Sequence, residues 1–261
     1  MSRILSNEIL ERYDRDGIAF PIRVFSDQEV GFFRDGLDSI VRIAGPMKRL
    51  DGLHMFFDWA SALVRHGALL DVIQDLLGSD ILVLGTLVFY KPPRDNSYAS
   101  WHQDSVYSGM HLTPSTSAWI ALTPSNPSNG CMRVIPGSHK LGQLAHINSQ
   151  DRSNLLRRGE QLASVDDSQA VDVILQPGEM SLHQSTIVHG SNPNTSDGPR
   201  IGFIVRFVTN RIEDRDKVML RVRGKADCGH LTLAEPLPRA DHQSAVAAWL
   251  AFANSRQQPP R

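Results

Sequence analysis

The feature that most limits how this chain can fold is a series of short apolar runs, rich in β-branched residues, that starts after Asp80. The runs are separated by Pro, Gly, Asn and Ser, which favour turns. Such a pattern is typical of an antiparallel sandwich or barrel. The runs are Ile81–Tyr90, Ala118–Thr123, Met132–Ile135, Val171–Leu175, Met180–Leu182 and Ile201–Val208.

One break between these runs has the composition of a defined turn, Gln176-Pro177-Gly178-Glu179. Proline fixes φ near the value needed at the first central position of a type II turn, and glycine supplies the positive φ of the second. The sequence therefore predicts a hairpin at this point.

The residues before Asp80 have helical periodicity. Ser26 and Glu29 fit a capping box at the start of one helix. From Trp59 to Leu77, apolar residues recur at spacings of three and four, and Gly78 is placed to end this second helix. Residues 1–79 are therefore predicted to be mainly helical.

The chain is predicted to form one domain over residues 1–261, mainly β with flanking helices. The β core is expected over 80–224. It contains a long polar insertion over 141–169, with a short helix at 154–158, and insertions of this length are often functional. Apolar residues at helical spacing predict a last helix over 240–255.

Composition and charge narrow the kind of partner. The formal net charge is -1, with 41% hydrophobic and 21% charged residues, so nothing favours nucleic acid or a membrane. No apolar run approaches the roughly 20 residues of a membrane span, and the N-terminus lacks the apolar segment of a secretory signal. We expect a cytoplasmic protein that acts on a small molecule and keeps Cys131 and Cys228 reduced. These features do not predict the oligomeric state.

Residues suited to metal chemistry lie in Trp101-His102-Gln103-Asp104, after the first strand-like run. Side chains alternate along a strand, so His102 and Asp104 are predicted to point to the same face. His189 is a candidate to complete two histidines and one carboxylate on one face of a metal ion. Arg200, eleven positions later, is placed to pair with a carboxylate beside the metal. Taken alone, the His-x-Asp triplet also fits a hydrogen-bonded pair without a metal.

Four segments taken in order resemble the phytanoyl-CoA dioxygenase family of Fe(II)/2-oxoglutarate oxygenases. They are His102-Gln-Asp104, Cys131-Met-Arg-Val-Ile-Pro-Gly-Ser-His139, His189-Gly-Ser191 and Arg200. The resemblance covers residues from about Gly17 to Asn210. It implies a double-stranded β-helix core, which is a cupin-like jelly roll, with helices packed on one side. It also implies Fe(II) as the metal, with 2-oxoglutarate and O2 as cosubstrates.

The resemblance assigns the iron to His102, Asp104 and His189. Three protein ligands leave adjacent positions open for the cosubstrate and dioxygen, which a closed four-ligand site does not. His183 is the rival for the distal ligand, but the Gly-Ser after His189 and its distance from Arg200 favour His189. Halogenating relatives replace the carboxylate with a small residue, so the presence of Asp104 favours hydroxylation over chlorination.

The cosubstrate residues implied by the resemblance are Arg200, Ser191, Trp119 and Lys48. Arg200 would bind the distal carboxylate of 2-oxoglutarate, with assistance from Ser191. Burying that carboxylate without a charge partner would cost several kcal/mol. The planar guanidinium also matches a carboxylate better than an ammonium group does.

The substrate side of the site is predicted from residues that flank these segments. They are Tyr90, Tyr98, Trp101, Tyr107, His54, His183 and Arg206. Aromatic and polar groups mix there, which favours a small polar molecule, such as an amino acid, a phosphonate or a natural-product intermediate, over a long acyl-CoA. Hydroxylation of a C–H bond, with conversion of 2-oxoglutarate and O2 to succinate and CO2, is the expected reaction. Desaturation, epoxidation or cyclisation on the same iron, and a non-catalytic jelly-roll module that only binds a ligand, are the alternatives.

Overall fold

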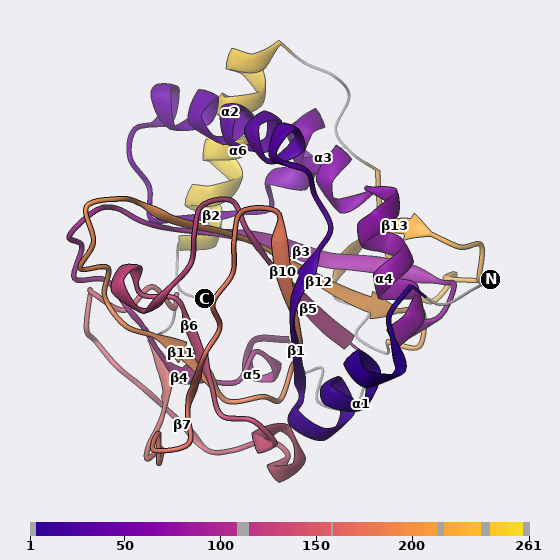
Figure 1. Cartoon of the computed structure of the whole chain (residues 1–261). Helices are drawn as coiled ribbons and strands as arrows, with labels where there is room; N and C mark the ends of the chain where they lie inside the picture. Colours follow the sequence, from indigo (N-terminus) through magenta and orange to yellow (C-terminus); the bar gives the residue numbers. More distant parts are fainter. Residues whose placement is uncertain (1–3, 109–114, 158, 213–216, 236–240, 258–261) are drawn as a thin grey trace.

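Two β-sheets face each other in the computed structural model, and helices cover the outer side of the larger sheet (Figure 1). The structure describes residues 4–108, 115–157, 159–212, 217–235 and 241–257. The helices are α1 (Asn7–Asp16), α2 (Asp27–Ala44), α3 (Asp58–Val64), α4 (Gly67–Leu77), α5 (Ser105–Ser108) and α6 (His242–Gln257), with short 3-10 turns η1 (Leu53–Met55), η2 (Pro127–Asn129) and η3 (Ser138–Leu141).

The larger sheet has eight strands within the described ranges, in the order β1, β10, β5, β12, β3, β13 and β14, with β2 paired to β3. Their bounds are β1 (Ile18–Arg23), β2 (Arg49–Asp51), β3 (Ile81–Lys91), β5 (Ser115–Ala121), β10 (Glu179–Gln184), β12 (Arg200–Thr209), β13 (Val218–Arg223) and β14 (Thr232–Ala234). The pairings are antiparallel except that of β13 with β14.

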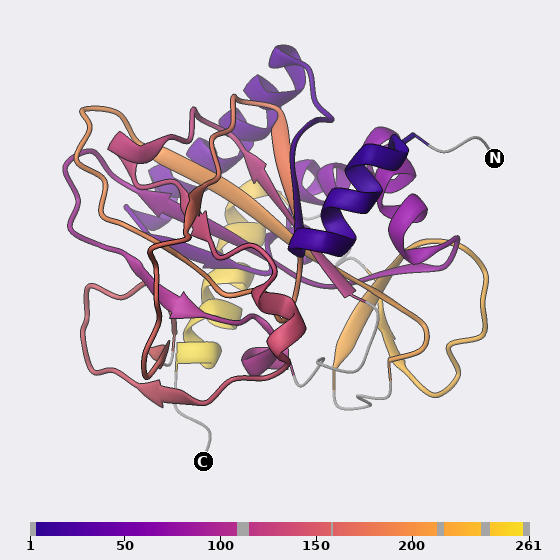
Figure 2. The same ribbon diagram turned by 60° about the horizontal axis from the view of Figure 1, so that its bottom comes forward.

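The smaller sheet runs in the order β4, β11, β6 and β9. Its strands are β4 (Ala99–His102), β6 (Met132–Val134), β9 (Val171–Asp172) and β11 (His189–Ser191). Figures 1 and 2 show these strands on the side of the larger sheet that faces away from α2 and α3. Two facing, mainly antiparallel sheets with helices outside form a jelly roll, so the predicted fold class is confirmed.

Alternation along β12 divides the interior into two cores. Phe203, Val205 and Phe207 point outward and pack in the core shared with the helices. Ile204 points inward and packs in the core between the sheets, and Arg206 faces the cavity there. The larger sheet is therefore buried on both faces, which explains the long apolar run in the sequence.

The predicted capping box at α2 is confirmed, since the Ser26 hydroxyl accepts from the Glu29 amide and the Glu29 carboxylate accepts from the Ser26 amide. The single helix predicted from Trp59 to Leu77 is wrong, because α3 and α4 are separated at Arg65 and His66. The His66 backbone is extended, and its Nε2 lies 2.9 Å from Glu29 Oε1. The break thus lets the side chain of His66, at the start of α4, contact Glu29 in α2.

The predicted type II turn is supported by a hydrogen bond from the Glu179 amide to the Gln176 carbonyl and by a φ of 84° at Gly178. The hairpin leads into β10, which lies between β1 and β5. The strand β1 was not predicted, because it lies inside the part of the chain expected to be mainly helical. It adds an edge to the larger sheet.

The insertion over 141–169 is tied to the smaller sheet. It contains β7 (His146–Asn148) and β8 (Glu160–Leu162), which pair with each other. The helix predicted at 154–158 is wrong for the residues described there, which exclude 158. Asn154 bonds to Ser100, and the Leu155 amide donates to the Tyr98 carbonyl, so tertiary hydrogen bonds replace those of a helix.

The predicted last helix is α6, which starts at His242 and ends at Gln257. Its Trp249 is fully buried, and the indole Nε1 donates to the Asp51 carbonyl at 2.9 Å. Cys131 and Cys228 are both buried free thiols. Among the described residues, no helix combines the length and apolar character needed to cross a bilayer.

Candidate functional site

His102 and His189 meet because β4 and β11 are neighbours in the smaller sheet. His102 is the last residue of β4 and His189 the first of β11, and they are directly opposite in the antiparallel register. Their ring centroids are 4.1 Å apart. Cross-strand neighbours of this kind bring two side chains together although 87 positions separate them in sequence.

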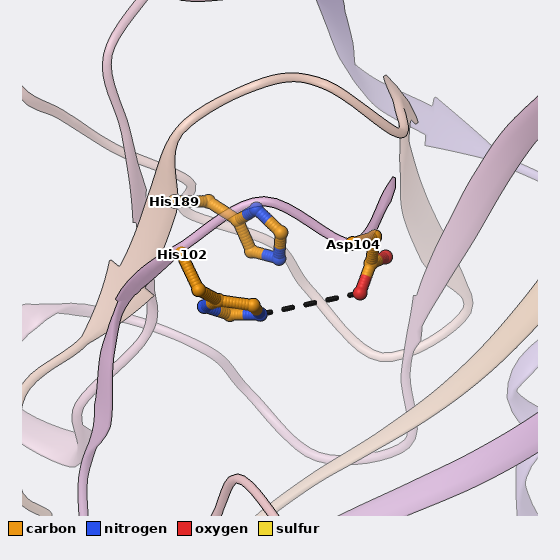
Figure 3. Close-up of side chains that lie close together, drawn as sticks. All are labelled: His102, Asp104 and His189. Carbon is orange, nitrogen blue, oxygen red and sulfur yellow. Dashed lines mark ion pairs between the residues drawn. The ribbon is translucent and has the colours of Figure 1, made fainter. Parts of the chain in front are cut away.

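Asp104 reaches the same point from the turn after β4. The prediction that both motif residues project from one strand is therefore only partly right, since the strand ends at His102. One ligand atom from each of His102, Asp104 and His189 lies within 4.8 Å of the other two, and all three side chains are buried (Figure 3). These distances allow one metal ion to contact all three residues.

The backbone orients both imidazoles. His102 Nδ1 lies 2.8 Å from the Ser100 carbonyl, and His189 Nδ1 lies 3.1 Å from the Ile187 carbonyl. A carbonyl only accepts, so each Nδ1 carries the proton and each Nε2 keeps its lone pair. Fixing the second ring nitrogen in this way is typical of histidines that bind metals.

The Asp104 carboxylate is held on both oxygens. Arg206 Nη2 lies 2.7 Å from Oδ1, and the Ser117 hydroxyl donates to Oδ2 at 3.1 Å. Burial raises the pKa of Asp104, but the Arg206 guanidinium and then His183 outweigh it and hold the pKa well below its usual value. Burial lowers the pKa of His102 and, more strongly, that of His189. The site therefore presents two neutral imidazoles and one ionised carboxylate, the forms that bind a metal.

This donor set fits a divalent iron ion. Two imidazoles and one carboxylate on one face are the ligands of non-haem Fe(II) oxygenases, in which the remaining positions stay open. Here the open side faces a cavity of about 630 Å³, lined by all three residues. Small-molecule sites have volumes of roughly 300–1,000 Å³, so there is room for more than one reactant.

Arg200, Ser191 and Trp119 form one wall of this cavity. Arg200 Nη2 lies 2.8 Å from the Gly130 carbonyl and 3.4 Å from Ser191 Oγ. Its guanidinium carbon is 5.4 Å from the centre of the Trp119 ring. A side chain at Gly202 would overlap that ring, because a Cβ there would lie 2.1 Å from it. Burial lowers the pKa of Arg200 to about 10, so the guanidinium stays charged near pH 7.

Three predicted substrate residues also line the cavity: His54, His183 and Arg206. His54 Nδ1 lies 2.9 Å from Thr86 Oγ1, and burial lowers its pKa to about 4, so the ring is neutral near pH 7. His183 is 2% exposed, and its Nε2 lies 3.7 Å from Asp104 Oδ2. Arg206 contacts the candidate metal ligand Asp104.

Other predicted residues are not among those lining the cavity. Lys48 pairs with Asp95 at 2.6 Å and is half exposed. Tyr90 packs against the core shared with the helices, because its neighbour Phe89 takes the inward face. The Tyr98 hydroxyl donates to Asp151, and the Trp101 ring lies beside the Arg133 guanidinium. The side chain of Tyr107 lies outside the described residues. These contacts correct the predicted placement of Lys48, Tyr90, Tyr98 and Trp101 in the pocket, and the placement of Tyr107 stays a prediction.

Lys91 was missed by sequence reasoning. It is fully buried at the end of β3, directly opposite Arg200, and its Nζ lies 2.8 Å from Ser191 Oγ. A lysine at the end of an otherwise apolar strand was a possible signal. The pairing of β3 with β12 was needed to place it beside Arg200.

Comparisons with known proteins agree with this geometry. The family model described as phytanoyl-CoA dioxygenase (PhyH) matches residues 13–202. A solved structure titled "non-heme monooxygenase; ThoJ apo" is 31% identical, with a TM-score of 0.78 over 96% of each chain.

Two curated relatives are more distant. The "Probable alpha-ketoglutarate-dependent hypophosphite dioxygenase" of Stutzerimonas stutzeri is 27% identical over 67% of this chain, and the match spans 60% of that protein. The "Ectoine dioxygenase" of Sphingopyxis alaskensis is 26% identical over 77% of this chain and 76% of its own length.

Proposed function

Because this chain belongs to the phytanoyl-CoA dioxygenase family, we propose that it is an Fe(II)- and 2-oxoglutarate-dependent dioxygenase that hydroxylates a C–H bond of a small polar molecule. The observation that carries the proposal is the convergence of His102, Asp104 and His189 within 4.8 Å, at the wall of a cavity that also contains Arg200. A structural metal site would be closed by a fourth protein ligand, and it would not require a buried guanidinium nearby.

His102, Asp104 and His189 would hold the iron. When bound, iron and 2-oxoglutarate supply the oxidising chemistry, in which O2 gives one oxygen atom to the substrate and one to succinate, with release of CO2. The chain itself supplies binding and orientation. Arg200 and Ser191 bind the distal carboxylate of 2-oxoglutarate, and Trp119 covers the guanidinium from one side.

The arginine is suited to this task because of its burial. A carboxylate brought to this site loses its water and needs a charged partner in return. The guanidinium provides charge and a fork of donors, while the Ser191 hydroxyl adds a further hydrogen bond. Asp104 is a separate anion, and Arg206 is its partner rather than a cosubstrate anchor.

The named relatives support a small molecule as the substrate, since one is an ectoine dioxygenase and another a hypophosphite dioxygenase by name. The substrate of this chain is accordingly proposed to be a diffusible amino acid, phosphonate or natural-product intermediate. A cytoplasmic location is also part of the proposal, and fractionation of cells that express the tagged protein would test it.

The test is turnover of purified protein loaded anaerobically with Fe(II) and then given 2-oxoglutarate, O2 and a panel of candidate substrates. We expect succinate release that requires Fe(II), and a product heavier than its substrate by one oxygen atom. The His102→Ala variant, prepared identically, serves as the matched control and should release no succinate. A product lacking two hydrogen atoms would instead identify desaturation. If the protein consumed no 2-oxoglutarate with any of the candidate substrates, the proposal would be contradicted.

A further inference from the structure

Two basic side chains are buried side by side at the proposed cosubstrate site. Lys91, the last residue of β3, and Arg200, the first of β12, face each other in the antiparallel register. Lys91 is 0% exposed and Arg200 2% exposed. Adjacent strands thus place two basic groups side by side in the interior of the protein.

The two side chains also share their hydrogen-bond acceptors. Lys91 Nζ lies 3.3 Å and Arg200 Nη2 2.8 Å from the Gly130 carbonyl. Lys91 Nζ is 2.8 Å from Ser191 Oγ, which lies 3.4 Å from Arg200 Nη2. Lys91 Nζ also contacts the Asn192 carbonyl. Each acceptor is uncharged, and within the described part of the chain neither cation has a carboxylate within 4.0 Å.

This arrangement is unfavourable if both groups are charged. Burying one charge without a counter-ion costs several kcal/mol, and a second like charge nearby adds repulsion. Arginine stays protonated under these conditions, so lysine is the group that gives up its proton. Burial, and then Arg200, lower the pKa of Lys91 to about 6, while Cys131 and Asp95 act weakly in the opposite direction. Burial raises the pKa of Cys131 to about 11, so the thiol supplies no negative charge near pH 7.

We propose that Lys91 is a second basic residue of the cosubstrate site, which is neutral in the free enzyme and takes up a proton when the distal carboxylate of 2-oxoglutarate binds beside Arg200. The inference rests on the proposed function. Lys91 is a positioning residue, because it acts through Ser191 and Arg200. Once protonated, it donates to Ser191 and to the two carbonyls and adds a positive charge behind the bound carboxylate.

The sign of the pH dependence follows from this. The arriving carboxylate raises the pKa of Lys91 above its value in the free enzyme, so binding takes up a proton when the pH exceeds about 6. The affinity for 2-oxoglutarate is therefore constant at pH values below the pKa of Lys91 in the free enzyme, and it falls as the pH rises above that pKa. The dissociation constant should increase by up to about tenfold per pH unit until the pKa of the bound state is passed.

Titration calorimetry tests the proposal with protein saturated with Mn(II), which replaces Fe(II) and prevents turnover. Heats of 2-oxoglutarate binding at pH 7.5, measured in buffers with different ionisation enthalpies, give the number of protons taken up. We expect an uptake approaching one proton in the wild type. The dissociation constant, measured from pH 6.5 to 8.5, should rise with pH.

Two variants separate this role from a structural one. Lys91→Arg keeps a permanent charge, so 2-oxoglutarate should bind without proton uptake and without the pH slope. Lys91→Met should also lose the proton uptake and the pH slope. Compared with the wild type at the same pH, its affinity for 2-oxoglutarate should be reduced most at pH 6.5 and should be nearly equal at pH 8.5. The exposed Lys140→Met change is the matched control and should match the wild type.

The outcomes are distinct. Wild-type protein that binds 2-oxoglutarate without proton uptake, or Lys91→Arg protein that retains the uptake, would overturn the inference and leave the proposed function intact. Wild-type protein that does not bind 2-oxoglutarate at all would overturn the proposed function itself. If Lys91→Met does not fold, Lys91→Arg decides the question alone.

Discussion

Two parts of the cavity wall are built from different kinds of segment. At the metal end, His102 and His189 come from neighbouring strands, and Arg200 and Arg206 from one strand of the facing sheet. The rest of the wall, called the far end below, includes pieces outside the central strands: η1 with the residue after it, the insertion, β13 and α6 supply His54, Met55, Phe56, Leu156, Arg157, Val218 and Phe252. Strand register fixes the first set, whereas separate loops and helices bring the second together.

This difference suggests a division of labour. Side chains on paired strands hold their positions closely, as a metal site and a cosubstrate site require. Segments outside the core tolerate change better, and changes there alter the shape of the cavity without disturbing the ligands. Substitutions at the metal end should therefore affect the chemistry with every substrate, and those at the far end should affect the choice of substrate.

Loss of a metal ligand is expected to have the largest effect. In Asp104→Ala, the carboxylate between the two histidines and Arg206 is removed, which leaves two imidazoles and takes away the contact of the Arg206 guanidinium with Asp104. Turnover should fall at least about 100-fold, since even residues that only support a ligand change metal affinity by 10–100-fold. Fe(II) affinity and succinate release are the measurements. Ser153→Ala, in the exposed part of the insertion, is the control. Wild-type turnover in Asp104→Ala would break the comparison.

Loss of the cosubstrate arginine should come next. Arg200→Gln keeps hydrogen-bonding capacity and removes the charge, so the KM for 2-oxoglutarate should rise roughly 10- to 150-fold, the equivalent of about 1.5–3 kcal/mol for a charged hydrogen bond. Metal affinity should be unchanged. An unaltered KM would show that Arg200 does not bind the distal carboxylate.

A change at the far end should leave those quantities alone. Met55, in η1, lines the cavity at this end. Met55→Ala should therefore lower kcat/KM for the best substrate by at least roughly tenfold, because each methylene group that a substrate contacts in a fitted pocket is worth about 1–3 kcal/mol. The KM for 2-oxoglutarate and the Fe(II) affinity should stay at wild-type values.

The matched control is Met47→Ala, because Met47 is also partly buried against the core shared with the helices but is not among the residues that line the cavity. If Met55→Ala weakened Fe(II) binding as well, the two ends would not be independent. If it changed neither substrate use nor metal binding, this part of the cavity would not contact the substrate.

The smallest effect is expected from Trp249 in α6, which is one of the elements of the far end. Trp249→Phe removes the hydrogen bond from the indole to the Asp51 carbonyl and keeps most of the apolar contact. The free energy of unfolding should fall by about 1 kcal/mol, the usual net value of one such bond. Chemical denaturation measures this loss. A change in metal affinity in this variant would contradict the separation of the two ends.

The sequence was sufficient to find the three residues that converge at the cavity and to predict most of the fold. His102, Asp104 and His189 were selected from their spacing, their neighbouring residues and the family resemblance, and the apolar runs located β3, β5, β10 and β12, although their ends shifted. Those strands are buried on both faces, which makes the runs conspicuous. The Pro-Gly turn at 177–178 was recognisable because few sequences satisfy its backbone angles.

The features that the sequence did not reveal depend on which strands pair, at which register, and on which face of a strand each side chain takes. Tyr90 and Phe89 are adjacent, and only the packing decides which of them faces the cavity. Lys91 and Arg200 are neighbours only because β3 pairs with β12 at one register. The pairing of Arg206 with Asp104 likewise joins a strand of one sheet to a turn beside the other. Contacts between segments far apart in sequence cannot be read from periodicity.

The most direct test of the central claim is an anaerobic titration that combines protein, Fe(II) and 2-oxoglutarate and follows visible absorption. If His102, Asp104 and His189 hold iron beside the Arg200 pocket, a metal-to-ligand charge-transfer band should appear only when all three components are present, and it should be absent in Asp104→Ala. Absence of the band in folded wild-type protein, or an equal band in Asp104→Ala, would contradict the account.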